Sequence, residues 1–122
     1  MQRLLMFRSG NRQFGSNVVA KLSHVKTLDI LWQEYVSGIN GYKPASQFTS
    51  AERGKVKSTF SRRKVFWSSM IKLLSYGIDA SVLIERLESI YGNDRSSVST
   101  ILSNMQKDKT LTKYFEKHPL NA

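Results

Sequence analysis

The feature of this sequence best suited to binding a ligand is a run of basic side chains that no acidic residue interrupts. No Asp or Glu occurs from Lys55 to Ile78. This stretch and the residue two before it carry positive charge at Arg53, Lys55, Lys57, Arg62, Arg63, Lys64 and Lys72. Such a block binds phosphates, because each neutralised phosphate releases condensed counterions. The candidate DNA contacts are Arg53, Lys55, Lys57, Ser61, Arg62, Arg63 and Lys64.

Different roles are expected within this block. Successive residues of a helix point about 100° apart, so Arg62, Arg63 and Lys64 cannot all face one groove. The forked guanidinium groups suit Arg62 and Arg63 to reading guanine, whereas Lys55 and Lys57 are expected on phosphates. A solvated basic face and a nuclear-import signal are the alternative interpretations of the same residues.

The sequence contains few of the residue patterns that enzymes use for catalysis. It has no cysteine, which excludes disulfides, thiolate zinc sites and cysteine nucleophiles. His24 and His118 stand far apart, and neither has metal-ligand spacing. No Gly-x-Ser-x-Gly elbow and no phosphate-cradling glycine loop occurs. Glu85 and Glu88 are spaced as on an exposed helix face. We expect no catalytic residue, metal, cofactor or small-molecule substrate.

The balance of charge points to an anionic partner. The 122 residues carry 19 Lys and Arg against 9 Asp and Glu, a net charge of +10. A field of this sign attracts DNA, RNA or acidic lipid headgroups. No apolar run approaches the roughly 20 residues that span a bilayer, so no membrane partner is expected. The acid-free start, with Arg3, Arg8 and Arg12, predicts a flexible basic arm over residues 1–21; a mitochondrial transit peptide is the alternative.

Helices must position these side chains. Apolar residues recur at helical spacing in five main segments, which predicts an all-α, compact multi-helix bundle. The predicted helices cover residues 28–37, 44–54, about 58–76, 80–91, a segment after Asp94, and a short last helix over about 110–117. Val36 and Ile71 are placed on the apolar faces of the first and third helices. Trp32 and Tyr35 are expected to hold these two helices together.

Three motifs then form a recognisable series. The first is Trp-x-Glu-Tyr-x-x-Gly-x-x-Gly, which places Trp32, Glu34, Tyr35, Gly38 and Gly41. The second is Pro44 followed by Phe48, and the third is the run 61–64 opening a helix that carries Phe66 and Trp67. Over about residues 22–107 the chain resembles the C-terminal DNA-binding domain of the fungal activators of glycolytic genes, a family shared with the high-osmolarity-induced transcription protein. The family usually has a Trp-Arg pair after the glycine before the basic helix, whereas Lys55, Val56 and Lys57 follow Gly54 here.

The resemblance implies a sequence-specific, double-stranded DNA-binding domain of a fungal transcription regulator in the nucleus. Other transcription factors would be further partners through parts of a longer protein. The domain is expected over residues 22–117, with a tail over 118–122. A centromere- or plasmid-binding module, a mitochondrial nucleic-acid-associated protein and a helical interaction module that binds no DNA are the alternatives.

Overall fold

The computed structural model describes residues 18–93 and 96–120. These residues form six α-helices and one short 3₁₀ helix, and they contain no strand. The elements are α1 (Leu28–Val36), η1 (Ala45–Gln47), α2 (Ser50–Lys55), α3 (Lys57–Leu74), α4 (Ala80–Tyr91), α5 (Val98–Lys107) and α6 (Thr112–Lys117). This confirms the predicted all-α multi-helix bundle. Most of the predicted basic arm, with Arg3, Arg8 and Arg12, lies outside the described residues, as do Asp94 and the end of the tail.

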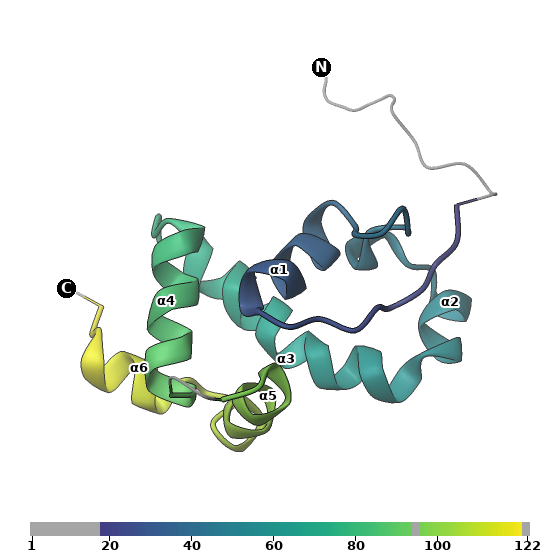
Figure 1. Cartoon of the computed structure of the whole chain (residues 1–122). Coiled ribbons are helices and arrows are strands. Elements are labelled where there is room, and N and C mark those ends of the chain that lie inside the picture. Colours follow the sequence, from purple (N-terminus) through teal and green to yellow (C-terminus); the bar gives the residue numbers. More distant parts are fainter. Residues whose placement is uncertain (1–17, 94–95, 121–122) are drawn as a thin grey trace.

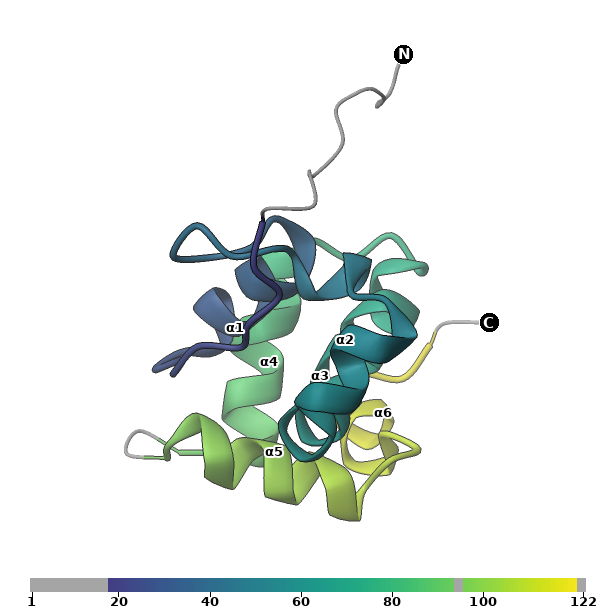
Figure 2. The same cartoon turned by 90° about the vertical axis from the view of Figure 1, so that its right-hand side faces the viewer.

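The long helix α3 runs through the middle of the bundle (Figure 1). It packs against α1, α2, α4 and α5. Its inward face is completely covered by these neighbours, with Phe66, Trp67, Met70 and Leu73 at most 1% exposed. Helix α5 forms the lower edge of the molecule in both Figure 1 and Figure 2. Burial on one side of α3 leaves its other side as a continuous outer surface.

Two helix starts are set by capping side chains. The Thr27 side chain accepts a hydrogen bond from the Ile30 backbone N–H, and the Asp79 side chain accepts one from Ser81. These side-chain acceptors satisfy N–H groups that have no partner within the helix. The start of the fifth helix differs: α5 begins at Val98, with Ser97 rather than Asp94 as its cap.

The predicted helix over residues 44–54 is wrong as a single element, because it is broken at Phe48. Thr49 and Glu52 form a capping box that starts a new helix there. Phe48 is consequently extended, with φ −63° and ψ 134°, although it is buried in the core as expected. Gly54 lies inside α2 rather than at its end.

Two apolar residues placed on inward faces lie on the surface instead. Val36 is 52% exposed and Ile71 is 49% exposed. Glu34 occupies an inward position on α1, and a residue two further along a helix points about 200° away from it. On α3, the neighbouring helices cover a narrower stripe than the apolar pattern suggested.

Aromatic side chains join α1 to α3. Tyr35 stacks on Trp67 with ring centroids 5.1 Å apart, and Trp32 meets the Phe66 ring edge-on at 6.4 Å. The Trp67 indole N–H donates to the Leu31 carbonyl at 2.9 Å. These contacts confirm the predicted structural role of Trp32 and Tyr35.

Candidate nucleic-acid interface

A buried ion pair links the first and third motifs. Arg63 Nη1 lies 2.5 Å from Glu34 Oε1, and Arg63 Nη2 donates to the Ser23 carbonyl at 2.8 Å. The Ser23 N–H donates to the other oxygen of Glu34 at 3.0 Å. We call Ser23, Glu34 and Arg63 the clamp. Because the Glu34 side chain is 2% exposed, its charge depends on Arg63 for compensation.

The clamp changes the role expected of Arg63. As a candidate DNA contact it should present its guanidinium to solvent, but this group is bonded inside the protein and its side chain is 13% exposed. The physical reason is the buried carboxylate on α1, which attracts the one arginine of the run that points inward. Arg63 is therefore a structural residue in this fold.

The glycines of the first motif also have structural roles. Gly38 has φ +82°, and an added Cβ would lie 2.3 Å from the Tyr42 carbonyl oxygen. Gly41 has φ +75° with open space around it. Both conformations favour glycine, and the close backbone approach at Gly38 excludes any side chain. With the aromatic contacts and the clamp, the motif builds the α1–α3 junction rather than a binding surface.

The outer side of α3 carries a basic stripe. Its members are exposed, lie three or four residues apart and include no acid; they are Lys57, Ser61, Lys64, Ser68 and Lys72. We call these five residues the lysine stripe. Residues at this spacing share one face of a helix, so the positive charges extend along its length. In the described part of the chain, none of these lysines forms an ion pair.

The remaining candidate cations divide into engaged and free groups. Arg62 donates to the Ser99 hydroxyl and so bridges α3 to α5. Arg53 donates to the Phe48 carbonyl at 2.8 Å and to the Ser50 hydroxyl at 3.0 Å, which ties it to its own segment. Lys55 is exposed at the end of α2. Both arginines are nevertheless exposed, so of the predicted block only Arg63 is withdrawn from the surface. Lys55 and the lysines of the stripe are the exposed cations of this block without a hydrogen-bonded partner in the described residues, and Lys72 lies over the Phe115 ring at 5.7 Å.

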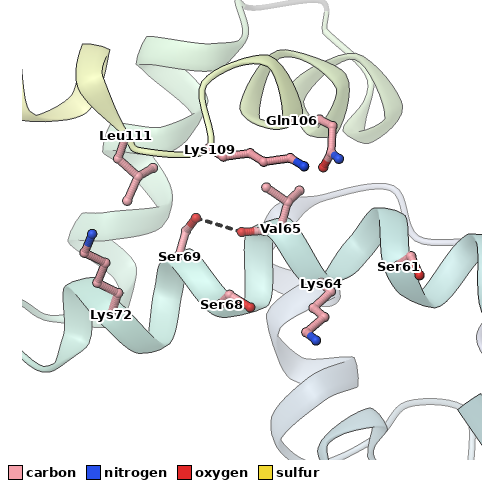
Figure 3. Close-up of a pocket in the computed structure, with 9 residues that line it drawn as sticks. All are labelled: Ser61, Lys64, Val65, Ser68, Ser69, Lys72, Gln106, Lys109 and Leu111. Atoms are coloured by element: carbon pink, nitrogen blue, oxygen red, sulfur yellow. Dashed lines mark hydrogen bonds between the residues drawn. The ribbon is translucent and has the colours of Figure 1, made fainter.

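A groove of about 310 Å³ runs beside the lysine stripe (Figure 3). One wall comes from α3, and the other comes from the end of α5 and the turn that follows it. Its lining residues are Ser61, Lys64, Val65, Ser68, Ser69, Lys72, Gln106, Lys109 and Leu111. Three lysines, the hydroxyls of Ser61 and Ser68, and an amide with no acid make the groove complementary to phosphate oxygens, whereas the Ser69 hydroxyl donates to the Val65 carbonyl.

Acidic side chains gather elsewhere. Glu85 and Glu88 lie exposed on α4, and the position of Asp29 on α1 is close enough to affect Glu88. Burial raises the pKa of Glu88 above its usual value, and the charges of Asp29 and Glu85 raise it further. The expectation that Glu85 and Glu88 form an exposed face is confirmed. Helix α3 therefore carries basic residues and no acid, whereas α4 exposes two acids.

The contacts predicted from the sequence do not include the α5 side of this surface. Ser99, Ser103 and Gln106 are exposed on α5, and Lys107 and Lys109 follow them. A signal was present in the sequence, because no acid occurs between Asp94 and Asp108. It was weaker than the signal of the α3 block because this segment has fewer cations.

Over residues 18–93 and 96–120, no cluster of three or more His, Asp or Glu side chains could hold a metal ion. None of the helices in that part of the chain has the length and apolar character to cross a bilayer. No protein-family profile, curated protein or solved structure matches the chain.

Proposed function

We propose that this chain binds double-stranded DNA through the surface formed by α3 and α5. The observation that carries the proposal is the lysine stripe, which runs along the outer side of an 18-residue helix without an acidic neighbour on that helix. The groove beside it adds Lys109 and hydroxyl donors. Lysines contact phosphates without distinguishing bases, so this surface supplies affinity for the DNA backbone.

Duplex DNA fits this surface better than other nucleic acids do. An exposed helix can enter the major groove of B-DNA, whereas the major groove of duplex RNA is too deep and narrow. Binding of single strands relies on exposed aromatic rings that stack on bases. Here the large rings Trp67 and Phe66 are at most 1% exposed, and Tyr35 is stacked on Trp67. Tyr76, just beyond the end of α3, is 45% exposed, and a single ring does not form a stacking platform for successive bases.

The family resemblance extends the proposal to sequence-specific regulation of transcription in the nucleus. Its motifs supply the α1–α3 junction, and that junction fixes the helix that carries the lysine stripe. On this proposal the chain is a binding domain without catalysis, and other transcription factors are its protein partners.

The salt dependence of binding tests the proposal. If Lys55, Lys57, Lys64, Lys72 and Lys109 each neutralise one phosphate, log K for a random-sequence duplex should fall with log salt at a slope of about −4 to −5. Removing two charges with Lys64→Ala and Lys72→Ala should make this slope shallower by about two. Lys117→Ala, on the exposed end of α6, is the matched control and should leave the slope unchanged. No binding at low salt would contradict the proposal.

A further inference from the structure

We infer that α5 reads the base edges, while α3 and the adjoining groove hold phosphates. This inference rests on the proposed DNA binding and deepens it by assigning the element that gives sequence preference. It replaces the expectation that arginines at the start of α3 carry this role. The observation behind it is the difference between the side chains that the two helices expose.

The exposed side of α5 is polar and largely uncharged. Ser103 and Gln106 lie three residues apart, so they share one face of the helix, and Ser99, one turn earlier on that face, accepts a hydrogen bond from Arg62. These side chains carry both hydrogen-bond donors and acceptors, which is what discrimination among base edges requires. Gln106 in particular can pair with the N6 and N7 atoms of adenine. Lysines, by contrast, act on α3 as point charges.

Helix α5 is firmly held on its other side. Val98, Ile101, Leu102 and Met105 are all at most 8% exposed. The Asn104 amide donates to the Tyr91 carbonyl at 2.8 Å, and the Ser97 side chain caps the first turn. Arg62 bonds Ser99 from α3. A reading helix needs this support, because specificity depends on side chains held in fixed positions.

The surroundings of α5 suit insertion into the major groove. It forms the lower edge of the molecule in two perpendicular views, with α3 packed against it from above (Figures 1 and 2). Of the groove lysines, Lys64 and Lys72 lie on α3 and Lys109 lies in the turn after α5, while Lys107 ends α5 itself. A helix in the major groove has a phosphate backbone along each side. From Ser99 to Gln106 the helix rises about 10 Å, which corresponds to about three base pairs.

The two arginines expected to read bases are engaged elsewhere. Arg63 belongs to the clamp, so it cannot leave α1 without exposing the charge of Glu34 to an apolar interior. Arg62 is bonded to Ser99 and sits in a second groove between the starts of α3 and α5. Its position suits support of α5 or contact with a phosphate.

Selection from a pool of random duplexes tests the inference with the full chain. We expect wild type to select a short preferred sequence. Gln106→Ala should lose the preference at one position and bind the selected duplex roughly 10-fold to 100-fold more weakly, with little change for a scrambled duplex. Ser103→Ala should alter a neighbouring position. Because both side chains are exposed, melting curves should remain at the wild-type temperature.

Two controls separate the outcomes. Gln47→Ala removes an exposed amide from η1, away from α5, and should change nothing. Lys64→Ala should weaken the selected and scrambled duplexes by the same factor. The inference is overturned if the Gln106→Ala, Ser103→Ala double variant selects the wild-type sequence with an unchanged affinity ratio while lysine variants still weaken binding. Wild type that binds no duplex would overturn the proposed function itself.

Discussion

The α1–α3 junction and the α3–α5 surface use the same helix for opposite purposes. At the junction, α3 turns Arg63 and Trp67 inward to meet Glu34 and Tyr35. On the other side, it turns Lys64 and Ser68 to solvent. Arg63 and Lys64 are adjacent in the sequence and equally basic, yet one neutralises a buried carboxylate and the other remains available. Charge in a sequence is therefore not itself evidence of a contact surface; the residue that the charge faces decides its role.

The largest expected effect comes from opening the clamp. Arg63→Ala leaves the Glu34 carboxylate buried without its partner, which costs about 3–5 kcal/mol. Lys64→Ala, the adjacent exposed residue, should change the free energy of unfolding by less than about 0.5 kcal/mol. Urea unfolding of both variants measures the contrast. Equal stability of the two would show that the ion pair contributes nothing to the fold.

The next effect separates two glycines of the same motif. Gly38→Ala combines a left-handed conformation with a Cβ 2.3 Å from the Tyr42 carbonyl, so we expect a loss of about 2–3 kcal/mol. Gly41→Ala has the unfavourable φ but no neighbouring atom, and about 1 kcal/mol should be lost. Thermal melting of the two variants ranks them. A larger loss at Gly41 would contradict the close approach that defines the junction.

DNA binding should depend on Lys64 and not on Arg63, which is the reverse of the expected effect of these two residues on stability. Lys64→Ala should make the salt slope for duplex DNA shallower by about one, because one phosphate contact is lost. Arg63→Ala, measured at low temperature where the chain is still folded, should keep the wild-type slope. Fluorescence titration at four or five salt concentrations measures both slopes. If the slope changed for Arg63→Ala and not for Lys64→Ala, Arg63 would be the residue that contacts DNA, and Lys64 would be an exposed residue without a phosphate contact.

The smallest effect concerns the acidic side of the molecule. The pKa of Glu88 is raised in the folded chain, so its ionised form is less favourable there than in the unfolded chain. The stability it contributes is present below its ordinary pKa of 4.5 and is lost as pH rises through the folded-state value. Glu88→Gln should therefore raise the melting temperature at pH 7 by about 1–2 °C and have no effect near pH 4. Glu116→Gln on α6 is the control and should give no rise at pH 7.

The sequence was sufficient to predict the helices and much of the junction. Helical spacing of apolar residues located α1, α3, α4 and α5, and Thr27 and Asp79 marked two of their starts. It was not sufficient to separate Arg63 from Lys64, because the burial of Glu34 depends on how α1 lies across α3. The break at Phe48 was missed because the Thr49–Glu52 capping box was not recognised. Ser103 and Gln106 could not be singled out from the sequence, because uncharged polar side chains in an acid-free segment give a weaker signal than a block of cations.

The separation of lysines on α3 from acids on α4 also bears on how fast a complex forms. Charges divided in this way give the molecule an electric dipole whose positive end is the lysine stripe. The field of a polyanion exerts a torque on such a dipole, so on the proposed function the molecule would turn its α3–α5 side toward DNA before the two surfaces touch. A larger fraction of encounters would then begin in the orientation that leads to binding, which raises the association rate. This increase becomes smaller as added salt screens the field.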